Sequence, residues 1–128
     1  MLNDLSPKKN QIVFGDDSIV IKKYIAGIEG GRTLDVTTFD GSVIKAGHII
    51  LRTEDGKYMP AGLSGDDYDP AGFEGEPVGV LYRSIQKSNP AASIMTAGVV
   101  NEAALPYPID ADIKRNLPHI IFSKDEEA

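Results

Sequence analysis

The sequence contains no cysteine, so it can form no disulfide, no thiolate metal site and no cysteine nucleophile. It is also poor in positive charge, with 13 Lys and Arg against 19 Asp and Glu and a formal net charge of −6. No basic cluster exceeds a pair such as Lys8-Lys9 or Lys22-Lys23. Because nucleic-acid binding normally requires a basic stripe that displaces counterions from the phosphates, we expect no nucleic-acid partner.

Long apolar runs are lacking as well. None approaches the ~20 residues that a membrane-spanning helix needs. The first five residues, MLNDL, do not show the charged-then-apolar pattern of a secretion signal. We therefore expect a protein that makes no membrane contact and stays where it is synthesised.

The composition is otherwise that of one globular domain. A chain of 128 residues has the commonest size for a single core, and 41% hydrophobic and 25% charged residues are ordinary values. We predict a flexible N-terminal arm over residues 1–17 and a single β-rich domain over residues 18–128. The arm mixes polar residues and a proline with a small apolar patch formed by Ile12, Val13 and Phe14. It either orders against a partner or is a plain frayed terminus.

Alternating apolar residues and turn signals predict a mostly β protein. Ile19, Ile21 and Ile25 lie on one face of a predicted strand that begins at Ser18 and breaks at the glycines of positions 27–31. Further strands are predicted over residues 33–39, 46–51, 78–83, 94–100 and 120–122. Residues 60–77, rich in Gly, Asp and Glu, predict a long acidic surface loop.

One short helix is predicted after Asp110. That residue is a plausible N-cap, and Ile113 and Leu117 share one helix face at i and i+4. Pro118 ends the helix after about two turns.

The residues that carry chemistry do not form a recognisable site. Asp66, Asp67 and Asp69 are clustered carboxylates, but the positions that follow lack the oxygen ligands of a calcium loop. His48 and His119 are the only histidines, and their spacing supplies no partners for zinc binding or catalysis. We therefore expect no metal, no cofactor and no enzymatic activity.

The final third of the chain resembles a known family. Residues 76–81 read EPVGVL and residues 94–105 read IMTAGVVNEAAL, and a short helix and a last β segment follow. This order is similar to the lambdoid phage head decoration proteins, which carry an (A/P)-V-G-(I/V)-L strand and a strand ending G-x-(V/F)-x-x-E-x-x-L. The N-terminal part, notably residues 30–36 and 43–47, resembles head-fibre proteins from phages and prophages of gut Bacteroidales.

The resemblance implies a compact β-sandwich- or barrel-like decoration-protein fold (β-tulip-like) and a place on the virion. Proteins of this family are made in the bacterial host cytoplasm, trimerise, and bind the major capsid protein on the outer capsid surface. There they stabilise the head or support a head fibre. Because two carboxylate-rich surfaces do not attract each other, docking would rest on apolar and main-chain contacts. The arm would add a strand to a sheet edge of the capsid protein.

The segment from Gly98 to Tyr107 is our candidate for self-association or capsid contact. It passes from an apolar strand through Asn101 and Glu102 to Leu105 and two prolines. Leu105 and Tyr107 would serve as apolar anchors at the centre of an interface. The alternative, of similar weight, is that they cover the domain's own core.

Two other functions remain as alternatives. The first is a carbohydrate- or host-surface-binding fibre module. Sugar sites commonly use exposed aromatic residues, and this chain has no Trp, 5 Tyr and 4 Phe. The second, an accessory β domain of an enzyme, has no specific motif in its favour.

Overall fold

The structure is a computed structural model, and it describes residues 17–123 of the chain. Side-chain surroundings are described from Ile19 onward, except at positions 29–31. The predicted arm, including its apolar patch of Ile12, Val13 and Phe14, therefore lies outside the described residues except for Asp17.

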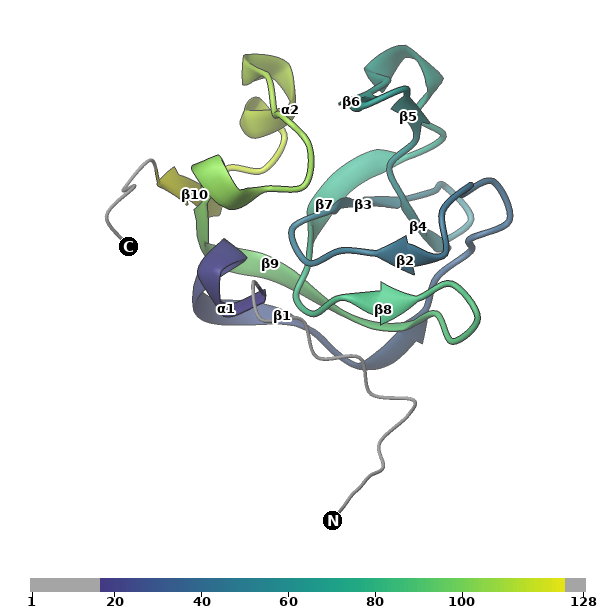
Figure 1. The fold of residues 1–128 in the computed structure, drawn as a ribbon, viewed down its shortest axis with the longest axis horizontal. Helices are drawn as coiled ribbons and strands as arrows, with labels where there is room; N and C mark the ends of the chain where they lie inside the picture. Colours follow the sequence, from purple (N-terminus) through teal and green to yellow (C-terminus); the bar gives the residue numbers. More distant parts are fainter. Residues whose placement is uncertain (1–16, 124–128) are drawn as a thin grey trace.

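A six-stranded sheet forms the centre of the molecule (Figure 1). Its strands follow the order β1-β9-β7-β3-β4 with antiparallel pairing, and β10 pairs with β9 in parallel. The strands are β1 (Ile21–Thr33), β3 (Ile49–Arg52), β4 (Tyr58–Pro60), β7 (Glu76–Leu81), β9 (Ala91–Asn101) and β10 (Ile120–Ser123). Two smaller sheets accompany it, β2 (Val43–Ile44) with β8 (Ile85–Gln86) and β5 (Leu63–Ser64) with β6 (Asp67–Tyr68).

The helical elements are short. They are α1 (Asp17–Val20), α2 (Ala111–Arg115) and the 3₁₀ turns η1 (Pro70–Gly72) and η2 (Glu102–Ala104). The prediction for α2 is confirmed. The carboxylate of Asp110 accepts a hydrogen bond from the backbone N–H of Ile113 at 2.9 Å and so caps the helix. Ile113 and Leu117 are both buried.

The main sheet packs apolar side chains on both of its faces. Along β3, Ile49 and Leu51 join one core cluster while Ile50 joins the other. The first cluster is covered by α2 and by Tyr68 of β6, and the second by the β2–β8 sheet. A strand buried on both faces needs apolar residues at consecutive positions, which explains the uninterrupted run that predicted a buried strand here.

The prediction for the first strand was wrong at both ends. Ile19 belongs to α1, and β1 starts at Ile21 and continues through the glycines to Thr33. Pairing with β9 overrides the local preference of glycine for turns. Position 27 requires glycine, because a Cβ atom there would lie 2.3 Å from the carbonyl oxygen of Ile94.

The strand predicted over residues 33–39 is also absent. Residues 34–36 have no strand structure and a turn follows at Thr37. The carboxylate of Asp35 accepts hydrogen bonds from the backbone N–H and the hydroxyl of Thr37, and these hold the pKa of Asp35 below its usual value. Such a local side-chain contact competes with strand pairing.

The predicted acidic loop is partly structured. Residues 60–77 contain the β5–β6 hairpin and η1, and Tyr68 reaches from the hairpin into the first core cluster. The overall prediction, a mostly β protein in a compact sandwich-like arrangement, is confirmed, and α1 is a second short helix beside the predicted α2. Within residues 17–123, no helix has the length and hydropathy to cross a membrane.

Candidate interaction surface

One face of the sheet presents apolar side chains at the end where β1, β9 and β10 lie side by side. Val99 of β9 pairs with Lys23 of β1 on one side and with Ile121 of β10 on the other. Directly paired residues point to the same face of a sheet, so these three side chains form a row. Ala97, two residues before Val99, points the same way.

Ile25 joins this row because β1 contains a bulge. Tyr24 pairs with Gly98 and Ala26 pairs with Ala97, which leaves Ile25 as an extra residue between them. Tyr24 packs against the first core cluster, whereas the side chain of Ile25 is 57% exposed. We call Lys23, Ile25, Ala97, Val99 and Ile121 the outer β9 face.

Neighbours in sequence explain why these side chains are excluded from the core. Ile120 belongs to the first core cluster and Phe122 packs against it, so Ile121 between them must point outward and is 58% exposed. Ile19, Ile25 and Ile121 are the exposed large hydrophobic residues of the described chain. Two of the three therefore lie on the outer β9 face.

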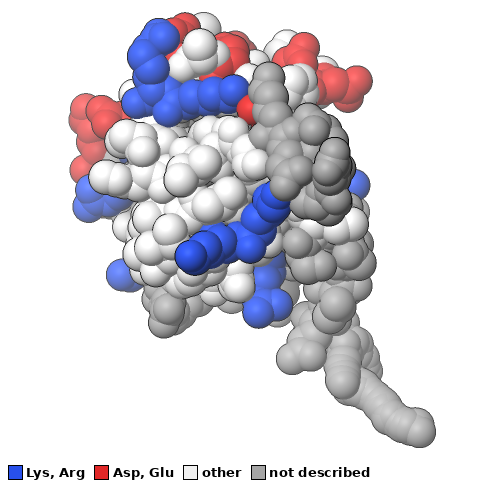
Figure 2. Space-filling view, turned by 90° about the vertical axis from the view of Figure 1, so that its left-hand side faces the viewer, with Lys and Arg blue, Asp and Glu red and all other residues white. Residues whose placement is uncertain are grey.

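Figure 2 looks onto the left-hand side of Figure 1, where β10 and the start of β1 lie. It shows a broad area of uncharged side chains that is crossed by Lys and Arg, with Asp and Glu gathered in the upper part. The outer β9 face contains one lysine and no carboxylate. In a chain with a net charge of −6, this is a surface on which an apolar partner meets little charge repulsion.

Of the residues predicted for self-association, Gly98 and Asn101 are buried inside the domain. A Cβ atom on Gly98 would lie 2.4 Å from the carbonyl oxygen of Lys23, so glycine lets β1 and β9 approach here. The side chain of Asn101 accepts a hydrogen bond from the backbone N–H of Ala103 at 3.2 Å and caps η2. Both residues serve the fold at these positions.

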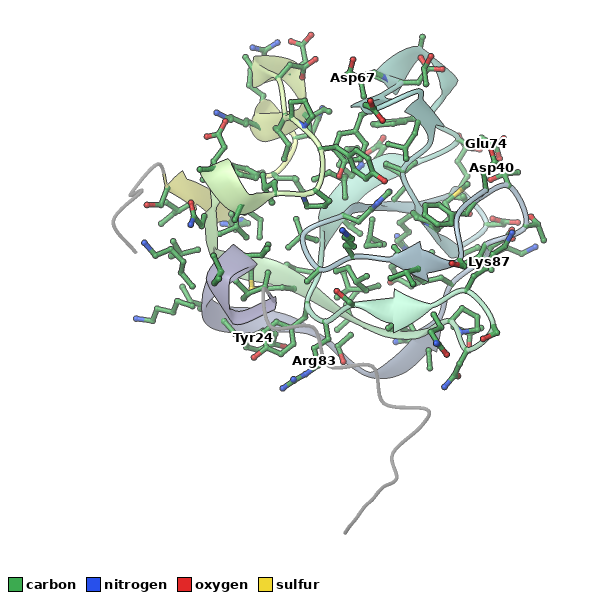
Figure 3. The ribbon with its side chains drawn as sticks, viewed as in Figure 1. Tyr24, Asp40, Asp67, Glu74, Arg83 and Lys87 are labelled. Atoms are coloured by element: carbon green, nitrogen blue, oxygen red, sulfur yellow. The ribbon has the colours of Figure 1, made fainter. Side chains whose placement is uncertain are left out.

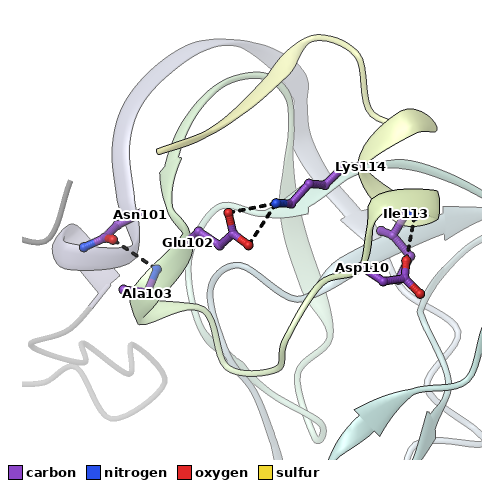
Figure 4. Close-up of polar contacts among 6 residues, drawn as sticks. All are labelled: Asn101, Glu102, Ala103, Asp110, Ile113 and Lys114. Atoms are coloured by element: carbon purple, nitrogen blue, oxygen red, sulfur yellow. Dashed lines mark hydrogen bonds and ion pairs between the residues drawn. The ribbon is translucent and has the colours of Figure 1, made fainter. Parts of the chain in front are cut away.

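Glu102 is engaged in an ion pair within the domain (Figure 4). Its two carboxylate oxygens lie 3.0 and 2.9 Å from the Nζ atom of Lys114 in α2. The Lys114 ammonium also lies 5.8 Å from the ring centroid of Phe122, a cation–π contact. The ion pair thus ties η2 to α2, and the cation–π contact ties α2 to β10.

Leu105 and Tyr107 pack against the first core cluster. The ring of Tyr107 contacts the rings of His48 and Tyr68, each at a centroid distance of 5.5 Å. Their positions match the second of the two interpretations, in which they cover the domain's own core. Their role in self-association stays a prediction. In that role the same two side chains would serve both the core and the interface.

Sequence reasoning missed Ile25 and Ile121 as surface residues. The bulge that turns Ile25 outward depends on the pairing of β1 with β9, which the sequence of β1 does not encode locally. The sequence did contain a signal at β10. Ile120 and Ile121 are consecutive residues of an edge strand, so only one of them can face the core.

His48 is the one strongly perturbed histidine, and it lies in the core. Its side chain is surrounded by the rings of Phe39, Tyr68 and Tyr107. Burial lowers the pKa of His48 to about 4, and the hydrogen bond with the Ala61 carbonyl opposes this only in part. Burial likewise raises the pKa of Tyr68, whose hydroxyl accepts the backbone N–H of Ile49 at 3.0 Å. A neutral imidazole in an aromatic cage is a packing element.

The described residues contain no cluster of three or more His, Asp or Glu side chains that could hold a metal ion. Asp66, Asp67 and Asp69 lie around the tip of the β5–β6 hairpin and just after it, with the first two exposed. His119 is exposed at the start of β10. These positions leave the outer β9 face as the feature best suited to a function.

Comparison of the chain with protein-family models, with curated proteins and with solved structures found no match.

Proposed function

We propose that this protein is a non-enzymatic structural protein of a bacteriophage virion that binds the outer capsid surface through its outer β9 face. The observation that carries the proposal is the exposed apolar row around Val99, with Ile121 and Ile25 more than half exposed. Monomeric surfaces scatter such residues singly, and a contiguous group marks an interaction site.

Two further points support the proposal. The motifs at residues 76–81 and 94–105 resemble those of head decoration proteins, and they lie in β7 and β9, with the second running on through η2. The face itself contains no carboxylate, which fits docking by apolar and main-chain contacts. The partner would be the major capsid protein, with three copies of the protein meeting at each site and the virion exterior as its location.

Binding to shells tests the proposal directly. Expanded, DNA-free heads from the phage or prophage that encodes the chain are mixed with the purified protein and sedimented. We expect the wild type to co-sediment at saturation and the Ile25→Asp variant to remain in the supernatant. The matched control is Ala71→Asp, which places the same charge on the exposed turn η1.

Two results would refute the proposal. The wild type could fail to bind expanded heads at all, or Ile25→Asp could bind as well as Ala71→Asp. Circular dichroism and thermal melting of each variant ensure that a loss of binding reflects the surface and not unfolding.

A further inference from the structure

A cavity lies beside the loop that leads into β2, and it shares no lining residue with the outer β9 face. It has a volume of about 300 Å³ and is lined by two segments, residues 38–43 and residues 60–65, together with Tyr107. Ligand pockets commonly span about 300–1,000 Å³, so this cavity has room for one small ring. Of its lining residues, only Tyr107 belongs to the segment predicted for self-association, and none belongs to the outer β9 face.

Two aromatic side chains form fixed walls of the cavity. Phe39 and Tyr107 both line it, and both rings pack edge-on against the buried ring of His48 at 5.7 and 5.5 Å. The carbonyl oxygen of Phe39 also accepts a hydrogen bond from the Nζ atom of Lys87. Walls held in this way need no ordering when a ligand arrives.

The polar groups of the cavity come from the same loop. Thr38 supplies a hydroxyl, and Asp40 supplies the one charged side chain among the lining residues. Figure 3 shows Asp40 on the loop before β2 and Lys87 after β8, on the same side of the molecule. A carboxylate accepts hydrogen bonds from ligand hydroxyls, and such charge-assisted bonds are stronger than neutral ones.

We propose that this cavity is a binding site for a neutral saccharide unit. A sugar ring has an apolar C–H face that suits Phe39 and Tyr107 and hydroxyl donors that suit the carboxylate of Asp40. An anionic ligand would be repelled by Asp40, and a purely apolar ligand would make no hydrogen bond with that carboxylate. Because Asp40 would also attract a cation, choline is the competing ligand in the titration below. The site shares no residue with the outer β9 face and does not depend on it.

Gly62 offers a clean way to block the cavity. It lines the cavity, and a Cβ atom built on it would meet no atom within 4 Å. Its backbone is not in the left-handed region, so a larger side chain is tolerated there. Gly62→Leu should fill the opening while the fold remains intact.

The experiment is a titration of the ¹⁵N-labelled full chain, followed by amide chemical shifts, with glucose, galactose, N-acetylglucosamine and choline as probes. A glycan array extends the panel. We expect a saccharide at millimolar concentration to shift amides of residues 38–41 and 61–65. Gly62→Leu should abolish the shifts, and Asp40→Asn should weaken binding by at least about tenfold. Asp66→Asn, an exposed acid outside the cavity, is the matched control and should bind as the wild type does.

Three outcomes would overturn the inference: no saccharide shifts these amides, the shifts persist in Gly62→Leu, or choline binds in place of the sugars. The Ile25→Asp variant separates this inference from the proposed function. It should lose binding to shells and keep saccharide binding, so that either proposal can fail alone.

Discussion

The Nε2 atom of His48 lies 2.9 Å from the backbone carbonyl oxygen of Ala61. A carbonyl oxygen only accepts, so in the neutral ring Nε2 carries the hydrogen and Nδ1 does not. Nδ1 is buried and has no hydrogen-bond partner among the described residues. Protonation would place a positive charge and a second donor in this apolar site, which explains why the pKa of His48 is lowered to about 4.

This histidine should make the fold sensitive to acid. Its pKa is about 6.5 in the unfolded chain and about 4 in the folded protein, so below pH 6.5 the unfolded chain binds a proton that the folded protein does not. The stability contributed by neutral His48 is therefore complete above pH 6.5 and is lost as the pH falls towards 4. The loss should reach up to about 3 kcal/mol.

Urea unfolding of the wild type and of His48→Gln, at a series of pH values, checks this prediction. The glutamine variant should be less stable at neutral pH, and its disadvantage should shrink steadily in acid. His119→Gln, an exposed histidine, is the control and should follow the wild type. Parallel pH curves for the wild type and His48→Gln would contradict the prediction.

Two glycines with opposite surroundings provide a second prediction. Gly98→Ala places a Cβ atom 2.4 Å from the carbonyl oxygen of Lys23 and 2.6 Å from the Sδ atom of Met95, so we expect a loss of about 1–3 kcal/mol. Gly62→Ala meets no atom within 4 Å and should stay within about 0.5 kcal/mol of the wild type. Thermal melting compares the two. A fully stable Gly98→Ala that fails to self-associate would instead support Gly98 as an interface residue.

The sequence was most informative where one segment decides its own structure. The cap at Asp110 and the spacing of Ile113 and Leu117 act within one helical turn or two, and they predicted α2 correctly. The buried run in β3 was likewise visible as consecutive apolar residues.

The sequence was least informative where the structure of a segment depends on partners distant in the chain. The bulged course of β1 through its glycines depends on β9, about 70 residues later, and no local pattern predicts it. The outer β9 face arises from that bulge and from the parallel pairing of β10. The cavity proposed to bind a saccharide is lined by residues 38–43, residues 60–65 and Tyr107, and only the folded chain brings these residues together.

The ion pair between Glu102 and Lys114 should couple η2 to α2. Both carboxylate oxygens contact the ammonium, and the Glu102 side chain is only 17% exposed. We expect a double-mutant cycle with Glu102→Gln and Lys114→Met to give a coupling of roughly 0.5–1 kcal/mol. Chemical unfolding of the four proteins measures it. A coupling of zero, together with lost self-association in Glu102→Gln, would assign Glu102 to an interface.

The last prediction separates the segment from Gly98 to Tyr107 from the outer β9 face as the contact surface. Leu105 packs against the first core cluster and close to Gly47, whose backbone is left-handed with φ +93°. Leu105→Asp would bring a carboxylate against this apolar contact, and we expect it to lower the free energy of unfolding by about 2–4 kcal/mol. Ile121 is 58% exposed, so Ile121→Asp should change stability by less than about 1 kcal/mol.

Melting temperature and shell binding, measured on both variants, give distinct patterns. If the outer β9 face is the contact, Ile121→Asp melts normally and no longer sediments with expanded heads, whereas Leu105→Asp melts early. If the segment from Gly98 to Tyr107 is the contact, Leu105→Asp stays folded and fails to bind, and Ile121→Asp binds normally. Because Leu105 packs against the first core cluster and Ile121 points away from it, neither substitution should imitate the other.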